Sequence, residues 1–251
     1  MTTGHDTYWS ALSALSCIAA HYHFESTDST NTQAKSITAL PANRMVLLTA
    51  CSQTGGRGQR GNTFFSSMPG SIYASIICPV DDISNHFHYN RSLSLAISEV
   101  LDNKQLNSPL FIKWPNDIYW NDKKVCGILL ESTPCSTRHI ILGFGINVNI
   151  ACSAFPKELR NTATSLLIET GRTLSCSVLL SNICTAFWNN RSIRPEILHR
   201  QYTARLYRQG SKVRINNQTG IFSTVLDDGR FGLKTDNEMI YFSAGSPEFL
   251  C

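Results

Sequence analysis

The sequence lacks the short motifs that mark several large enzyme classes. None of G-x-x-x-x-G-K-[ST], G-x-S-x-G and H-E-x-x-H occurs in its 251 residues, which argues against P-loop nucleotidases, the common serine hydrolases and zincin metalloproteases. It also has no internal repeat, no low-complexity tract and no apolar run of membrane-spanning length. We therefore expect no membrane partner. A chain of this length can bury the core of one large domain that carries a small appendage.

Metal ligands also lack a recognisable pattern. The nine cysteines form no C-x-x-C pair and have no regular spacing, which argues against a disulfide framework and a zinc site. Two His-x-His pairs, His21/His23 and His86/His88, would each place both rings on one side of a strand and could bind a metal. Because no third ligand is evident, packing or surface histidines are the favoured interpretation.

The charge balance and the cysteines indicate which kinds of partner and which cellular compartment to expect. Lysine and arginine total 22 against 18 acidic residues, and they are scattered, so we expect no nucleic-acid partner. The segment GRGQRG could be compared with RGG elements, but it is neither repeated nor set in a disordered tract. Residues 9–20 have the apolar character of a signal-peptide core, yet no lysine or arginine precedes them. Unpaired cysteines suit a reducing environment, and we expect a cytoplasmic protein.

Strand and helix signals alternate through most of the chain. Expected strands are 45–50, 71–78, 111–114, 118–120, 125–131 and 140–150, and expected helices are 91–103, 175–189 and 195–206. Since hairpins outnumber crossovers, these predict an α+β fold, a mixed or antiparallel sheet with helices packed on one face. From Gln209 onward, short strands and turn clusters predict a small β-barrel docked on the main domain. We expect domains at 1–206 and 207–251.

A glycine-rich segment, Gly56-x-Gly58-x-x-Gly61, follows the strand predicted at 45–50. A dinucleotide-binding turn would need a helix directly after the last glycine, but a strand is predicted there instead. The segment therefore predicts a loop between two strands. Its glycines would let the backbone approach a ligand, and Arg57 and Arg60 would meet an anion; a solvated hairpin loop is the alternative.

Ionic residues gather in the segment KWPNDIYWNDKKVCGILLE, which begins at Lys113. If its strands pair as a hairpin, Lys113, Asp117 and Lys124 converge in space. Two ammonium groups beside a carboxylate suit phosphoryl or nucleotidyl transfer, because the lysines offset developing charge and the acid can hold Mg²⁺. A salt-bridged hairpin end is the alternative that this pattern leaves open.

Four segments together resemble the motif series of the biotin protein ligases: Asp28-Ser29-Thr30-Asn31, GRGQRGN, the KWPND segment and GFGIN at 143–147. They occur in that family's order, and the likeness runs from about Phe24 to the C-terminus. It implies a class II synthetase-like catalytic domain followed by an SH3-like domain. It also implies a short form, because the residues before Phe24 are too few for the DNA-binding domain of some relatives.

The resemblance implies a function and its reactants. Members of that family activate biotin with ATP to biotinyl-5′-AMP and transfer biotin to one lysine of a carrier. It therefore implies biotin as substrate, ATP and Mg²⁺, and a biotin carboxyl carrier protein or domain of a biotin-dependent carboxylase as acceptor.

The resemblance also implies roles, residue by residue. Positions that match biotin contacts are Ser29, Thr30, Asn31, Gln53, Gly56, Arg57, Gly58, Gln59, Lys124 and Gly127. Positions that match ATP or adenylate contacts are Arg57, Gln59, Arg60, Phe64, Lys113, Asn116 and Asn147. Matched catalytic positions are Arg57, Lys113, Asp117 and Lys124, and Asp117 also matches a Mg²⁺ position.

Two departures from the family pattern are visible. Many relatives have a second arginine where this chain has Gln59, and that arginine helps retain the adenylate. Phe64 stands where relatives often have tryptophan, which keeps an apolar wall.

The sequence leaves two other functions open. A lipoate or octanoate ligase would share fold and carrier chemistry, and a non-catalytic biotin sensor would not need Lys124 or Asp117. An exposed sheet edge could pair with a second copy, giving a homodimer, or with the carrier domain.

Overall fold

The computed structural model describes residues 11–102 and 109–250. Its main body is a seven-stranded sheet in the order β1-β2-β3-β7-β6-β5-β4. Strands β1 and β2 are parallel and all other neighbours are antiparallel, so the sheet is mixed, as expected. The strands are β1 (Ile18–Thr27), β2 (Met45–Gln53), β3 (Ile72–Pro79), β4 (Leu110–Lys113), β5 (Asp117–Trp120), β6 (Lys123–Thr133) and β7 (Ser136–Ile146).

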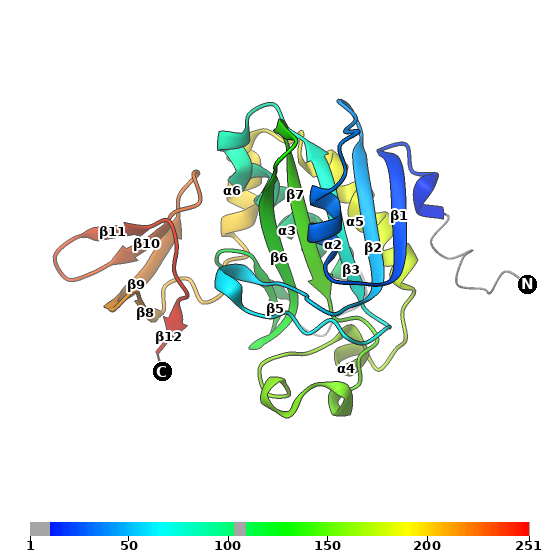
Figure 1. The fold of residues 1–251 in the computed structure, drawn as a ribbon. Helices are drawn as coiled ribbons and strands as arrows, with labels where there is room; N and C mark the ends of the chain where they lie inside the picture. Colours follow the sequence, from blue (N-terminus) through cyan, green and yellow to red (C-terminus); the bar gives the residue numbers. More distant parts are fainter. Residues whose placement is uncertain (1–10, 103–108, 251) are drawn as a thin grey trace, which may run out of the picture.

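Helices lie on both faces of this sheet (Figure 1). The long helices α3 (His86–Asp102) and α5 (Cys176–Asn190) pack on one face, and the short helix α2 (Thr30–Lys35) packs on the other. We expected helices on one face only; α2 is the difference, and it buries Ala34 against Val46 and Leu48 of β2. Because both faces of β2 and β3 are covered, consecutive residues of these strands are buried and neither strand alternates between apolar and polar positions.

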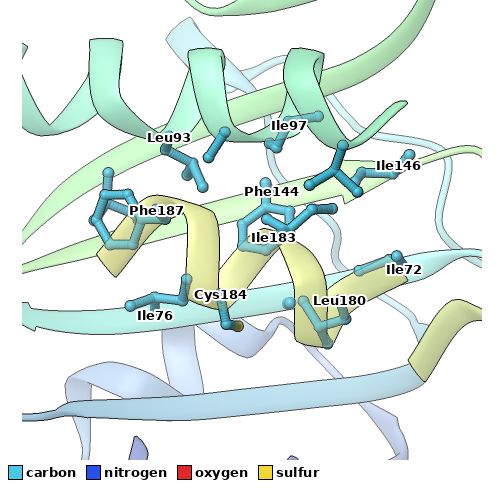
Figure 2. Close-up of a cluster of buried hydrophobic side chains, with 14 of the residues drawn as sticks. Ile72, Ile76, Leu93, Ile97, Phe144, Ile146, Leu180, Ile183, Cys184 and Phe187 are labelled. Carbon is cyan, nitrogen blue, oxygen red and sulfur yellow. The ribbon is translucent and has the colours of Figure 1, made fainter. Parts of the chain in front are cut away.

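The main core lies between the sheet and the two long helices. Figure 2 shows Leu93 and Ile97 of α3 and Ile183 and Phe187 of α5 gathered around Phe144 of β7. The other helical segments are η1 (Gln59–Gly61), η2 (Ile83–Asn85), η3 (Cys152–Ala154), η4 (Lys157–Leu159), α4 (Leu166–Thr170) and α6 (Pro195–Thr203). Within the described ranges, no helix is both long enough and apolar enough to cross a membrane.

The C-terminal part forms a second, antiparallel sheet in the order β11-β10-β9-β8-β12 (Figure 1). Its strands are β8 (Lys212–Ile215), β9 (Gln218–Val225), β10 (Phe231–Lys234), β11 (Met239–Phe242) and β12 (Glu248–Phe249). The expected turn at Asn216-Asn217 is present, with φ of 47° and 66°, the left-handed values of a tight hairpin. The expected barrel is not closed, because β11 and β12 are both edge strands among the described residues.

A separate apolar cluster joins this sheet to the main body, as expected for a small appendage. Phe222 and Phe231 of the sheet pack with Trp114 and with Tyr202 of α6. The Trp114 indole Nε1 also donates a hydrogen bond to Gly229 O, at 2.8 Å. The segment that begins with Lys113 is therefore attached to the C-terminal sheet.

Strand β1 is the longest element that sequence patterns did not predict; they also missed α2, α4 and β12. Strand β1 is an edge strand, and its burial does not alternate regularly, so no period-2 signal marks it. Its parallel partner β2 lies far along the chain. The expected helix at 91–103 begins earlier, at His86, and residue 103 falls outside the described ranges.

Candidate functional site

A cleft lies on the sheet face that carries α2, beneath the glycine-rich loop. Its cavity volume is about 190 Å³. Strands β6 and β7 form its floor, and Gly245 and Ser246 from the C-terminal sheet reach its rim. The predicted site residues that line it are Ser29, Thr30, Asn31, Gln53, Arg57, Gly58, Gln59, Phe64, Lys113, Asn116, Asp117, Lys124 and Gly127.

One end of the cleft is a network of hydroxyl and amide groups. Gln53 Oε1 accepts hydrogen bonds from Thr30 N at 2.8 Å and from Thr30 Oγ1 at 3.2 Å. The Ser75 hydroxyl lies 2.7 Å from Thr30 Oγ1 and 2.6 Å from Asn31 Oδ1. Because Ser75 is fully buried on β3, it fixes both side chains from below. Sequence reasoning did not identify Ser75, which lies in an otherwise apolar strand.

The floor of the cleft is made of glycines that leave room for ligand-facing side chains. A Cβ at Gly143 would lie 2.1 Å from Asn31 Oδ1, and one at Gly145 would lie 2.3 Å from a Phe64 ring carbon. Gly127 is paired with Gly145 across β6 and β7, and its Cβ would meet both Lys124 and Phe64. Any side chain at these positions would therefore enter the cleft or displace its walls.

Glu131 is an ionic residue of this region that sequence reasoning missed. Its carboxylate accepts from Asn31 Nδ2 at 2.7 Å and from Lys35 Nζ at 2.6 Å, and Arg57 Nη2 lies 3.5 Å away. Burial favours the neutral acid, but the hydrogen bonds from Lys35 and Asn31 and the charge of Arg57 outweigh it and lower the pKa of Glu131. Glu131 thus connects α2 and the glycine-rich loop to β6.

The Glu131 network predicts a pH-dependent contribution to stability. A carboxyl whose pKa is lowered in the folded state stabilises the fold above its unfolded pKa, about 4.3 for glutamate, and loses this contribution as the pH falls. We expect Glu131→Gln to lower Tm by roughly 2 °C at pH 7, a small effect because Lys35 and Arg57 are partly exposed.

Thermal unfolding from pH 7 down to about pH 3, well below the unfolded pKa of glutamate, measures this. The Tm difference between Glu131→Gln and the unmodified chain should shrink as the pH falls below about 4.3. The matched control is Glu238→Gln, at an exposed turn position, for which we expect no such difference. A constant difference across the range would contradict the charge assignment.

At the other end of the cleft, the three ionic residues converge as predicted. Lys124 Nζ lies 2.8 Å from Asp117 Oδ1, and Lys113 is directly opposite Asp117 in the β4–β5 pair. Burial lowers the pKa of Lys113; the charge of Asp117 opposes this, and the charge of Lys124 reinforces it. Lys113 Nζ also lies 5.0 Å from the centre of the Tyr119 ring. One carboxylate therefore lies between two lysines that come from the neighbouring strands β4 and β6.

The Trp114–Asn116 bend is held by contacts from two other elements. Asn116 Nδ2 donates to Ile128 O of β6, and Asn90 Nδ2 on α3 donates to Pro115 O at 3.0 Å. The Trp114–Pro115 bond is cis. Sequence reasoning did not identify Asn90, because it lies in a helix whose apolar residues form part of the core.

Some predicted residues do not line the cleft. Gly56 is buried below the loop, where a Cβ would lie 2.1 Å from Ser66 Oγ. Arg60 was also predicted to line the site, but its side chain lies outside the described part of the structure. Asn147 lines a neighbouring cavity of about 170 Å³, and its Nδ2 donates to Thr164 O at 2.9 Å.

The two cavities meet at a shared wall. Phe64 and Lys124 line both of them, and Lys124 Nζ lies 5.6 Å from the centre of the Phe64 ring. One ammonium group therefore stands where a ligand in the polar cleft and a ligand in the second cavity would meet. Such an arrangement can stabilise negative charge that develops between two bound reactants.

Comparison with known proteins gives consistent matches. Residues 23–147 match the model of the Biotin/lipoate A/B protein ligase family. The chain is 30% identical over 217 residues to the Biotin--[acetyl-CoA-carboxylase] ligase of Mycobacterium tuberculosis, covering 80% of this chain and 77% of that protein. It is 33% identical over 144 residues to the Bifunctional ligase/repressor BirA of Bacillus subtilis, covering 56% of this chain and 44% of that protein. This match therefore spans less than half the length of that relative.

The fold is also shared with solved structures. A biotin protein ligase from Aquifex aeolicus, solved in complex with biotin and ATP, superposes with a TM-score of 0.79 at 24% identity. The superposition covers 92% of this chain and 99% of the other. Because only a small part of either chain is left out, the superposed residues include part of the C-terminal sheet as well as the main body.

Proposed function

This chain belongs to the biotin protein ligase family, and from that premise we propose that it activates biotin with ATP and transfers it to a carrier protein. In the first step a biotin carboxylate oxygen attacks the α-phosphorus of ATP, giving biotinyl-5′-AMP and pyrophosphate. In the second step a carrier lysine amine attacks the carbonyl carbon of the adenylate, and AMP leaves. The observation that carries the proposal is the position of Lys124 at the wall shared by the two cavities.

The polar end of the cleft suits the ureido head of biotin. A buried urea needs partners for both its N–H groups and its carbonyl oxygen. Ser29, Thr30, Asn31 and Gln53 supply hydroxyl and amide groups in a fixed arrangement there. Gly143 and Gly127 leave the floor flat enough for a ring system to lie on it.

The basic residues suit the adenylation step. Lys124 would hold the biotin carboxylate against the α-phosphate and offset the charge that develops during attack, and Arg57 with Gly58 would close over the adenylate from the loop. Lys113 and Asn116 would contact ATP, and Asn147 would contact adenine in the second cavity. Gln59 and Arg60 would lie near the phosphate, and Phe64 would separate the biotin and adenine ends.

Asp117 is the residue that would hold Mg²⁺. Mg²⁺ bound with nucleotides commonly has one or two protein carboxylates and completes its shell with phosphate oxygens and water. A single carboxylate at the phosphate end of the cleft fits that donor set. Mg²⁺ would neutralise phosphate charge there, while Lys124 keeps Asp117 oriented.

Biotin-dependent exchange of labelled pyrophosphate into ATP tests the proposal. We expect exchange with biotin and none with lipoate or octanoate run in parallel, because an alkyl chain gives the amide-rich end no partners. A carrier domain should then become biotinylated on adding ATP and biotin. Exchange with octanoate or lipoate alone would favour the alternative ligase, and binding of biotin without exchange would favour a sensor.

Gln59 predicts weak retention of the adenylate. A glutamine can donate a hydrogen bond to phosphate but carries no charge, and a charged donor contributes about 1 kcal/mol more. We therefore expect Gln59→Arg to slow the release of biotinyl-5′-AMP about fivefold. Preloaded protein passed through a desalting column gives this rate, with Gln218→Arg at an exposed strand position as the control. An unchanged release rate would remove Gln59 from the phosphate contact.

We propose domains at residues 1–206 and 207–251, and a cytoplasmic location where ATP and carrier proteins are present. The exposed edge strand β1 supports strand addition as the docking mode of either the carrier domain or a second copy in a homodimer.

A further inference from the structure

A second group of polar side chains lies away from the cleft, on the strand pair at the edge of the sheet. His23 and Glu25 belong to β1, and Cys51 belongs to β2. Their ligand atoms all lie within 4.8 Å of one another. Phe24 packs on the α2 side of the sheet, so its neighbours His23 and Glu25 point to the opposite face. The group therefore faces away from the biotin and ATP residues proposed above.

Thr49 orients the His23 ring. Its Oγ1 lies 2.8 Å from His23 Nδ1 and 2.8 Å from His21 Nε2. One hydroxyl proton can be donated to only one ring, so the other ring donates to the oxygen. When His23 Nδ1–H donates to Thr49 and Thr49 donates to His21, the lone pair of His23 Nε2 points toward Cys51. Histidines that bind metals are commonly oriented by such a hydrogen bond on the second ring nitrogen.

The spacing of the two strongest ligands matches one metal ion. Cys51 Sγ lies 3.5 Å from His23 Nε2. For tetrahedral zinc, bonds of about 2.3 Å to sulfur and about 2.05 Å to nitrogen place those two atoms roughly 3.6 Å apart. The imidazole and the thiol therefore already have the separation that a shared ion requires.

We propose that His23 Nε2, the Glu25 carboxylate and Cys51 Sγ bind a transition-metal dication, for which Zn²⁺ is the best match, with water in the fourth position. On binding, the Cys51 thiol gives its proton to solvent, and no oxidation or reduction is involved. Thiolate and imidazole ligands favour Zn²⁺, whereas Mg²⁺ prefers oxygen ligands. The site is therefore chemically distinct from the one at Asp117.

Binding would connect the ends of two strands that lead into the cleft. Cys51 lies two residues before Gln53, and β1 runs into Thr27 and Ser29. An ion held by both strands binds only the folded chain, so it should raise Tm with increasing free metal concentration. The proposal concerns metal binding alone and does not rest on the proposed ligase activity.

Co²⁺, which gives a visible spectrum in zinc sites, provides the test. The full chain is titrated with Co²⁺ in excess Mg²⁺ and without nucleotide. We expect one equivalent to produce the visible d–d bands of tetrahedral cobalt and a thiolate charge-transfer band, and excess Zn²⁺ to remove both. Cys51→Ser and His23→Ala should abolish the charge-transfer band, and Thr49→Val should weaken binding roughly 10- to 100-fold.

The controls separate this site from other thiols and from misfolding. Cys135→Ser and Cys152→Ser remove exposed thiols elsewhere and should leave the spectrum unchanged. Glu25 is exposed, so Glu25→Gln should keep the fold and bind Co²⁺ at least tenfold more weakly, with an unaltered circular dichroism spectrum. An unchanged titration in Cys51→Ser or in Glu25→Gln, or an octahedral spectrum without the charge-transfer band, would overturn the proposal.

Discussion

Replacing Lys124 with methionine is expected to reduce biotin-dependent pyrophosphate exchange by roughly 100- to 1,000-fold, the usual loss for one group that stabilises transition-state charge. Methionine keeps most of the apolar stem against Phe64 but removes the ammonium group at the shared wall of the two cavities. The loss should appear in kcat, because the charge on the phosphate and carboxylate oxygens is greatest during attack.

The neighbouring residue gives a matched control. Lys123 precedes Lys124 on β6 and is paired with Trp120, so its side chain points to the other side of the strand. Lys123→Met should leave exchange within about twofold of the unmodified chain, as expected for a substitution away from the site. Equal losses in the two variants would indicate a general effect of charge removal and would count against Lys124 as the activating group.

Gly143→Ala is expected to weaken biotin binding while leaving ATP binding nearly unchanged. The added Cβ would lie 2.1 Å from Asn31 Oδ1, and Asn31 cannot easily move because Ser75 and Glu131 hold both ends of its amide. Overpacking of this kind costs about 1–3 kcal/mol, which corresponds to a roughly 5- to 150-fold rise in the Kd for biotin.

Ser75→Ala distinguishes the steric effect from a lost hydrogen bond. It removes the hydroxyl beside Asn31 without adding volume, and Glu131 still holds the amide nitrogen. We expect only about a fivefold loss of biotin affinity, the effect of about 1 kcal/mol. Isothermal titration of both variants with biotin, and separately with ATP, gives the comparison. Equal losses of biotin and ATP affinity in Gly143→Ala would show that the strand itself is disturbed.

Sequence patterns placed the Lys113, Asp117 and Lys124 group correctly because all three lie on consecutive hairpin strands. Tight turns such as Asn121-Asp122 set the pairing locally, so the approach of the side chains follows from the alternation of the strands. Glu131 lies on the same strand as Lys124, yet its partner Lys35 is 96 positions away in sequence. That contact depends on where α2 lies over the sheet, which no local pattern contains.

The same distinction applies to the larger elements. The turn at Asn216-Asn217 was predictable, since left-handed backbone favours asparagine, but the open edges of the C-terminal sheet were not. Cysteine spacing predicted no zinc site, because spacing rules find ligands that are close in sequence. His23 and Cys51 are 28 positions apart and meet only through the parallel pairing of β1 with β2.

The sequence by itself determined the chemistry of the protein: the order of its motifs, the mixed α+β character and the residues that carry charge and amide groups. These follow from residue identity and local spacing, which act over one turn or one hairpin. The tertiary structure decided which of them share a space. The position of Lys124 at the wall of two cavities, the glycine floor under Asn31 and the His23, Glu25 and Cys51 group all depend on strand order. Strand order is set by the burial of whole sheet faces against helices, an energy that is summed over distant parts of the chain and leaves no local signature.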